Sequence, residues 1–107
     1  MGGYPGHKGL DIAAATGTPI YAVADGTVIV SRSMSTGLGK HIQIDHGGGL
    51  VTTYGHASVL YAQVGQKVRQ GDVIALVGST GKSTGPHLHI EFIINGYYYN
   101  PQLYIKK

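Results

Sequence analysis

The chain has 107 residues, which suits one domain with a single hydrophobic core. It contains 18 glycines and only 12% charged residues, so short strands joined by many tight turns are expected. The absence of cysteine excludes disulfides and thiolate metal ligands, and the net charge of +3 comes from scattered lysines and arginines that disfavour nucleic acid as a partner.

The first candidate site residues along the chain are His7 and Asp11, at positions i and i+4. They share a face in a strand and in a helical turn alike, so their pairing does not depend on the local structure. Imidazole nitrogen and carboxylate oxygen are both ligands that zinc accepts. The spacing by itself is weak evidence for a metal site.

Four segments in the middle of the chain have the pattern of strands. In 26–31 and 40–45, apolar residues alternate with polar ones, and the glycine-rich stretches after each favour hairpin turns. The segment 50–54 runs towards His56, and 72–77 is almost continuously aliphatic, as in a buried central strand. No segment suits a long helix. The sequence therefore predicts an all-β, mainly antiparallel fold with little helix.

The last predicted strand, 87–94, places one aliphatic face on a core and carries polar residues on the other. His87 and His89 project from this polar face about 7 Å apart, so they can serve one site. The preceding loop, 78–85, is rich in glycine, serine and threonine but lacks the spacing of a phosphate-binding loop. A nucleotide site is not expected.

Six histidines allow several different metal sites. Two histidines and one carboxylate are a common ligand set for catalytic zinc, with further histidines available to transfer protons. An isolated histidine, however, is more often a residue of a loop or turn than a ligand. The residues alone leave the choice among these sets open.

The order of the motifs resembles the lysostaphin and LytM type of zinc metallopeptidases, which hydrolyse peptide bonds in peptidoglycan. The stretch 7–13, HKGLDIA, is similar to the first motif of that family, and 85–91, GPHLHIE, is similar to the last. Nearly the whole chain takes part in the resemblance. Four further segments match the family's order: 18–26, 44–47, 54–58 and 68–72.

The resemblance implies one metallopeptidase domain over residues 1–107, built as a small β-sandwich or barrel-sandwich hybrid. Zinc would be bound by His7, Asp11 and His89, with His56 and His87 as catalytic histidines beside the metal. The implied substrate is a peptidoglycan peptide, either a D-alanyl cross-link or a glycine bridge. Hydrolysis would then depend on a histidine that takes a proton and on another that stabilises the oxyanion or protonates the leaving amine.

The substrate implies a location outside the cell or in the cell envelope, although the first residues do not have the pattern of a signal peptide. No apolar run approaches the roughly 20 residues that span a bilayer, so membrane insertion is not expected. We also expect a monomer.

Three further residues have alternative interpretations. His41 and His46 are expected to be structural or exposed to solvent. Glu91 shares the face of His89 and either orients an imidazole at the metal site or is a hydrated carboxylate at the sheet edge. Tyr54, two residues before His56, is expected to be a packed strand tyrosine.

Two other functions compete with hydrolysis. A non-catalytic relative would keep the fold and bind cell wall to activate other hydrolases, but all proposed ligands and both catalytic histidines are present here. A swinging-arm carrier is suggested by 65–74, which resembles a turn of lipoyl and biotinyl domains. The candidate lysines Lys40 and Lys82 lack the flanking residues of a modified lysine, so hydrolysis is favoured.

Overall fold

The computed structural model describes residues 9–99, and the predicted metal ligand His7 lies outside them. The described residues form nine strands and no helix, and no helix that could span a membrane is therefore found among them. This confirms the predicted all-β class. The strands are β1 (Leu10–Ala13), β2 (Pro19–Tyr21), β3 (Gly26–Arg32), β4 (Lys40–Gly47), β5 (Leu50–Leu60), β6 (Lys67–Val68), β7 (Val73–Val77), β8 (His87–Ile94) and β9 (Tyr97–Tyr99).

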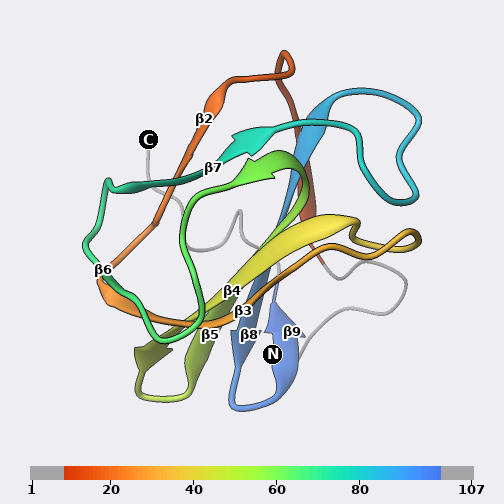
Figure 1. Ribbon diagram of the computed structural model, residues 1–107. Helices are drawn as coiled ribbons and strands as arrows, with labels where there is room; N and C mark the ends of the chain where they lie inside the picture. The colour runs from red at the N-terminus through yellow and green to blue at the C-terminus, as the bar shows by residue number, and fades with distance from the viewer. Residues whose placement is uncertain (1–8, 100–107) are drawn as a thin grey trace.

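All nine strands belong to one antiparallel hydrogen-bonded sheet, which curls so that β2 and β7 lie over one end of the other strands (Figure 1). The main path of the sheet is β1-β8-β5-β4-β3-β6; β7 joins it through β5, and β9 joins it through β8. The mainly antiparallel arrangement that the sequence predicts is therefore confirmed.

The long strand β5 connects the two parts of the sheet. Its first half, Leu50–Gly55, pairs with β8, whereas its last residues, from Ala57 to Leu60, pair with β7. His56 lies between these halves and has a φ of 62°, a left-handed conformation that non-glycine residues rarely adopt. The change of partner therefore occurs at His56, which the bend places at the junction of the two parts.

The five predicted strands all exist, and β5 continues six residues beyond the predicted 50–54. Three short strands, β1, β2 and β6, were not predicted. They contain four, three and two residues, too few for an alternating pattern to be recognised. They form because longer strands beside them supply hydrogen-bonding partners, which is a property of the tertiary structure.

The hydrophobic core lies on one face of the β4-β5-β8 part of the sheet, and β2, β3 and β7 contribute Ile20, Val28 and Ile74 to it. Ile42 and Ile44 from β4 and Tyr54 from β5 are almost fully buried. Ile90 and Phe92 of β8 belong to the same core, as the alternation in 87–94 predicts. His89 and Glu91, which alternate with these two residues on β8, therefore point to the opposite face.

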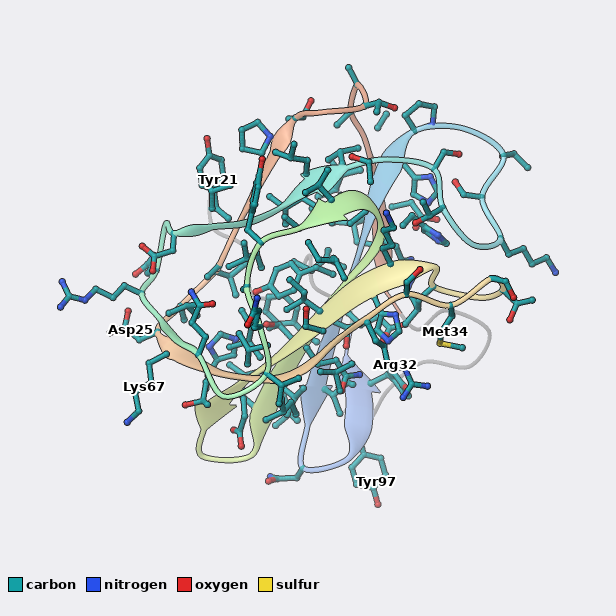
Figure 2. The ribbon with its side chains drawn as sticks, in the orientation of Figure 1. Tyr21, Asp25, Arg32, Met34, Lys67 and Tyr97 are labelled. Atoms are coloured by element: carbon teal, nitrogen blue, oxygen red, sulfur yellow. The ribbon has the colours of Figure 1, made fainter. Side chains whose placement is uncertain are left out.

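Two loops meet above that opposite face, 33–39 between β3 and β4 and 78–86 between β7 and β8. They approach so closely that a Cβ on Gly39 would lie 2.6 Å from the carbonyl oxygen of Thr80. Gly39 also has a φ of 63°, so a side chain would be strained there as well as crowded. Exposed side chains such as Met34 project outwards from the first loop (Figure 2).

Candidate active site

Three neighbouring strands bring four of the predicted site residues together. Asp11 on β1 is paired with His89 on β8, and His89 is paired on its other side with Gly55 of β5. His87 is two residues before His89 on the same face, and His56 follows Gly55. The imidazole ring of His56 lies 4.8 Å from that of His87 and 5.9 Å from that of His89, between ring centres.

His89 lies between two carboxylates. Its Nδ1 is 2.7 Å from Oδ1 of Asp11, and its Nε2 is 3.0 Å from Oε2 of Glu91. The two acids differ in exposure, because the side chain of Asp11 is 65% exposed whereas that of Glu91 is 8% exposed. Asp11 therefore faces the open side of the site, and Glu91 lies beneath the histidine.

His87 is held by the loop that precedes it. Its Nδ1 lies 2.9 Å from the carbonyl oxygen of Gly85 and 3.1 Å from Oγ of Ser83. Its Nε2 lies 3.5 Å from Oδ1 of Asp11. A neutral imidazole whose Nδ1 donates to a carbonyl has its lone pair on Nε2, so the acceptor nitrogen of His87 points into the site.

His56 is fixed by both loops above the site. Its backbone N–H donates to the carbonyl of Leu38 at 2.7 Å, and its Nδ1 lies 2.7 Å from the carbonyl oxygen of Thr80. These contacts stabilise the unusual φ of this residue, which would cost about 1–2 kcal/mol in an unconstrained chain. Donation from Nδ1 leaves the Nε2 lone pair of His56 available as a proton acceptor.

The environment shifts the pKa values of three of these groups. Burial lowers the pKa of His56, and the positive charges on His87 and His89 act in the same direction against the Thr80 carbonyl. The hydrogen bond from His89 to Glu91 raises the pKa of His89, and Asp11 assists it, against the effect of burial. The neutral form of His56 is therefore favoured, which suits a general base.

Partial burial by itself would raise the pKa of Asp11, but its hydrogen bond with His89 and the charges on the three histidines outweigh burial and lower it. Asp11 is thus held as a carboxylate, the form that binds a metal ion.

A metal site in this cluster needs a ligand beyond the described residues. Within 9–99, no group of three or more histidine, cysteine and acidic side chains is arranged to hold a metal ion. Asp11 and His89 nevertheless present an oxygen and a nitrogen to one another, and zinc accepts both donors. They fit zinc as two of its protein ligands, and His7, the third one predicted, lies outside the described residues.

Comparison with known proteins identifies the family. Residues 5–101 match the family described as peptidase family M23. The chain belongs to peptidase family M23. This domain is 42% identical to the catalytic domain of the prophage-encoded M23 protein EnpA from Enterococcus faecalis, with a TM-score of 0.85 over 98% of this chain and 87% of that one. The catalytic domain of the antimicrobial peptidase lysostaphin from Staphylococcus simulans is 32% identical, with a TM-score of 0.87 over 99% of this chain and 88% of that one.

Longer relatives contain this M23 domain as one part. The DD-carboxypeptidase/endopeptidase Mpg of Neisseria meningitidis is 50% identical over 89% of this chain, and the peptidoglycan DD-endopeptidase ShyC of Vibrio cholerae is 41% identical over 90%. The chain spans only 22% of the length of each of these proteins. The resemblance to lysostaphin-type peptidases that the motifs indicate is thus confirmed at the level of the family.

Other predicted residues lie away from the four-residue cluster. His41 is buried, with its Nδ1 2.9 Å from the carbonyl of Gly39, and His46 contacts the carbonyl of Asp25 and the hydroxyl of Thr52. Tyr54 is in the core, as expected. Thr80 was not identified from the sequence, since it contacts His56 through its carbonyl, a group that every residue carries.

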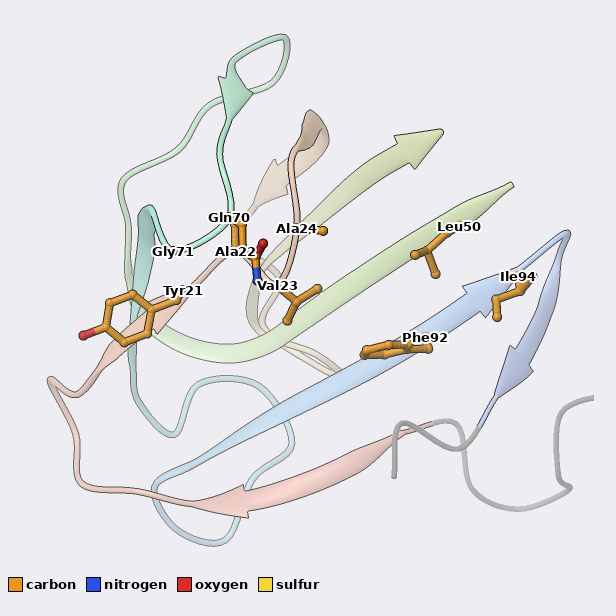
Figure 3. Close-up of a pocket in the computed structure, with 9 residues that line it drawn as sticks. All are labelled: Tyr21, Ala22, Val23, Ala24, Leu50, Gln70, Gly71, Phe92 and Ile94. Atoms are coloured by element: carbon orange, nitrogen blue, oxygen red, sulfur yellow. The ribbon is translucent and has the colours of Figure 1, made fainter. Parts of the chain in front are cut away.

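Two concave surfaces of the M23 domain differ in chemistry. A groove of about 380 Å³ on the site face has His56, His89, Glu91, Lys82 and Tyr98 among its lining residues. A larger pocket of about 700 Å³ lies on the core face of the sheet, where β8 contributes Phe92 and Ile94 (Figure 3). This second pocket is mainly apolar and has no histidine or acid among its described lining residues. The groove is the candidate active site because it contains His56 and His89 of the cluster.

Proposed function

We propose that this domain is a zinc-dependent endopeptidase that hydrolyses peptide bonds in bacterial peptidoglycan. The observation that carries the proposal is the convergence of Asp11, His56, His87 and His89 in one cluster of an M23 domain. Asp11 and His89, together with His7, would hold zinc. Bound zinc supplies a Lewis acid that polarises the scissile carbonyl and lowers the pKa of the attacking water.

The two remaining histidines would handle protons. His56 is the better candidate for the general base, because burial favours its neutral form and its Nδ1 contact with Thr80 leaves Nε2 free to accept a proton. In its protonated form, His87 would donate a hydrogen bond from Nε2 to the developing oxyanion or protonate the leaving amine, because its Nδ1 is already held by the carbonyl of Gly85. The proton that His56 takes from water would make up for the one that His87 gives to the leaving amine, and the two rings are neighbours.

Stem-peptide cross-links are the proposed substrate class, in preference to glycine bridges. Relatives named as DD-endopeptidases share 41% and 50% identity with this chain. A peptidoglycan substrate implies action in the cell envelope or outside the cell. One chain supplies all five proposed site residues, so a monomer suffices for activity.

The proposal is tested by measuring zinc content and peptide release together. Wild-type protein should bind one zinc ion and release cross-linked stem peptides from isolated cell walls, as detected by mass spectrometry. His89→Ala should lose zinc and hydrolysis. His56→Ala should retain zinc and lose hydrolysis by about 100-fold or more, because only the proton acceptor is removed.

Walls with and without glycine bridges separate the two substrate classes, because a stem-peptide enzyme acts on both. Release that depends on glycine bridges would contradict the proposed bond. Zinc lost equally from His56→Ala and His89→Ala would contradict the proposed roles, and no released peptide from any wall with zinc bound would contradict the enzyme itself.

A further inference from the structure

Glu91 is a buried acid with no role in the proposed chemistry. Its carboxylate is 8% exposed and lies 3.0 Å from Nε2 of His89. A buried carboxylate is costly unless a donor compensates it, and the histidine N–H is such a donor. The burial and the contact therefore belong to one arrangement, in which Glu91 accepts a hydrogen bond from beneath His89.

The start of β1 covers this carboxylate. A Cβ on Gly9 would lie 2.9 Å from Cγ of Glu91 and would also collide with the backbone carbonyl of Ile90. The backbone at Gly9 thus passes directly over the Glu91 side chain, two residues before Asp11. The Glu91 side chain is thus shielded from most of the solvent, which strengthens an electrostatic hydrogen bond.

The two ring nitrogens of His89 consequently face different surroundings. Nδ1 faces Asp11, whose side chain is 65% exposed and lies near Nε2 of His87. Nε2 faces the covered carboxylate of Glu91. Only one of these nitrogens can present a lone pair to a metal ion while the other keeps its proton, and Nδ1 is the nitrogen that faces Asp11, the other proposed metal ligand among the described residues.

We propose that Glu91 is a positioning residue, which holds the proton of His89 on Nε2 so that Nδ1 is presented to the metal. This inference depends on the proposed zinc site. Hydrogen bonding of a ligand histidine to a carboxylate fixes its tautomer and ring orientation and increases its strength as a donor. Glu91 does so without contacting substrate.

The test compares Glu91→Met and Glu91→Gln with wild type by zinc titration against a chromogenic chelator. Methionine has a similar length but its sulfur is only a weak hydrogen-bond acceptor, so Glu91→Met should bind zinc about 10- to 100-fold more weakly. Glutamine keeps an acceptor oxygen but loses the charge, so the zinc affinity of Glu91→Gln should lie between those of wild type and Glu91→Met. Affinity of Glu91→Met within about twofold of wild type would overturn the proposal.

A second measurement does not require Glu91→Met to fold. Long-range ¹H–¹⁵N correlation spectra of the zinc-loaded protein should show a protonated Nε2 on His89, with a proton resonance far downfield. In Glu91→Gln this resonance should move upfield, because a neutral acceptor forms the weaker hydrogen bond. An unchanged resonance in Glu91→Gln, or a wild-type His89 protonated on Nδ1, would overturn the proposal.

Thr52→Val serves as the matched control, since Thr52 is a buried polar residue on the core face of the adjacent strand. It should lose stability without losing zinc affinity, which separates a general effect of burial from a specific effect on His89. Wild-type protein that binds no zinc would instead contradict the proposed function. Failure of the proposed function can therefore be distinguished from failure of the proposed role of Glu91.

Discussion

At the scale of single residues, His56 combines a chemical and a conformational role. Its imidazole lies beside His87, while its backbone, with a φ of 62°, forms the bend at which β5 changes partner. Strained backbone at a site residue persists only when surrounding contacts hold it. Here the carbonyls of Leu38 and Thr80 provide those contacts.

This conformation leads to a prediction for two substitutions of His56. His56→Gly should be more stable than His56→Ala by about 1 kcal/mol, because glycine adopts positive φ without a steric penalty. Chemical denaturation measures the difference. Ser58, which is not among the positive-φ residues of the described chain, provides the control: Ser58→Ala should be more stable than Ser58→Gly. Equal stability of the two His56 variants would show that the bend is not strained.

At the scale of elements, the loops 33–39 and 78–86 support the site together. Thr80 joins them to the sheet, because its Oγ1 donates to the carbonyl of Ala57 at 2.6 Å and accepts from the backbone N–H of Lys40 at 3.0 Å. The carbonyl of the same residue holds His56. The position of one imidazole therefore depends on an anchored loop.

Thr80→Val keeps the size and shape of this side chain but removes both hydrogen bonds of the hydroxyl. We expect a loss of about 1–3 kcal/mol in the free energy of unfolding. The kcat for wall-peptide hydrolysis should fall about 10- to 100-fold through misplacement of His56, with zinc content unchanged. Ser79→Ala, in the same loop but exposed, is the control and should behave as wild type. Wild-type kcat in Thr80→Val would contradict this account.

At the scale of the whole molecule, the sheet separates a polar face with the candidate site from an apolar face with the core. Tyr54 belongs to the core face, where its hydroxyl accepts from the backbone N–H of Val23 at 3.2 Å and is hydrogen-bonded to Thr52 at 2.7 Å. Burial raises the pKa of Tyr54, so the phenol stays neutral. Stability and chemistry should thus respond to different substitutions.

Tyr54→Phe tests this separation. The variant leaves the buried partners of the hydroxyl unsatisfied and should lose about 1–3 kcal/mol of unfolding free energy. Its zinc content and peptide release should equal those of wild type at temperatures where it is folded. Tyr61→Phe, at a tyrosine that is 55% exposed, should change neither quantity. A loss of zinc from Tyr54→Phe would mean that the two faces are coupled.

The sequence alone determined the strand class, because alternation over 87–94 places His87 and His89 on one face and Ile90 and Phe92 on the other. It also indicated the family, through motifs in a fixed order. Such patterns are local, since side-chain direction follows from strand geometry within a few residues.

Only the tertiary structure decided which groups meet. Asp11 and His89 are 78 positions apart, and no local pattern specifies that β1 pairs with β8. The left-handed bend at His56, the contact with the Thr80 carbonyl and the burial of Glu91 beneath Gly9 likewise depend on long-range packing. Backbone carbonyls have no sequence signature, and the exposure of a carboxylate is set by whichever segment passes over it.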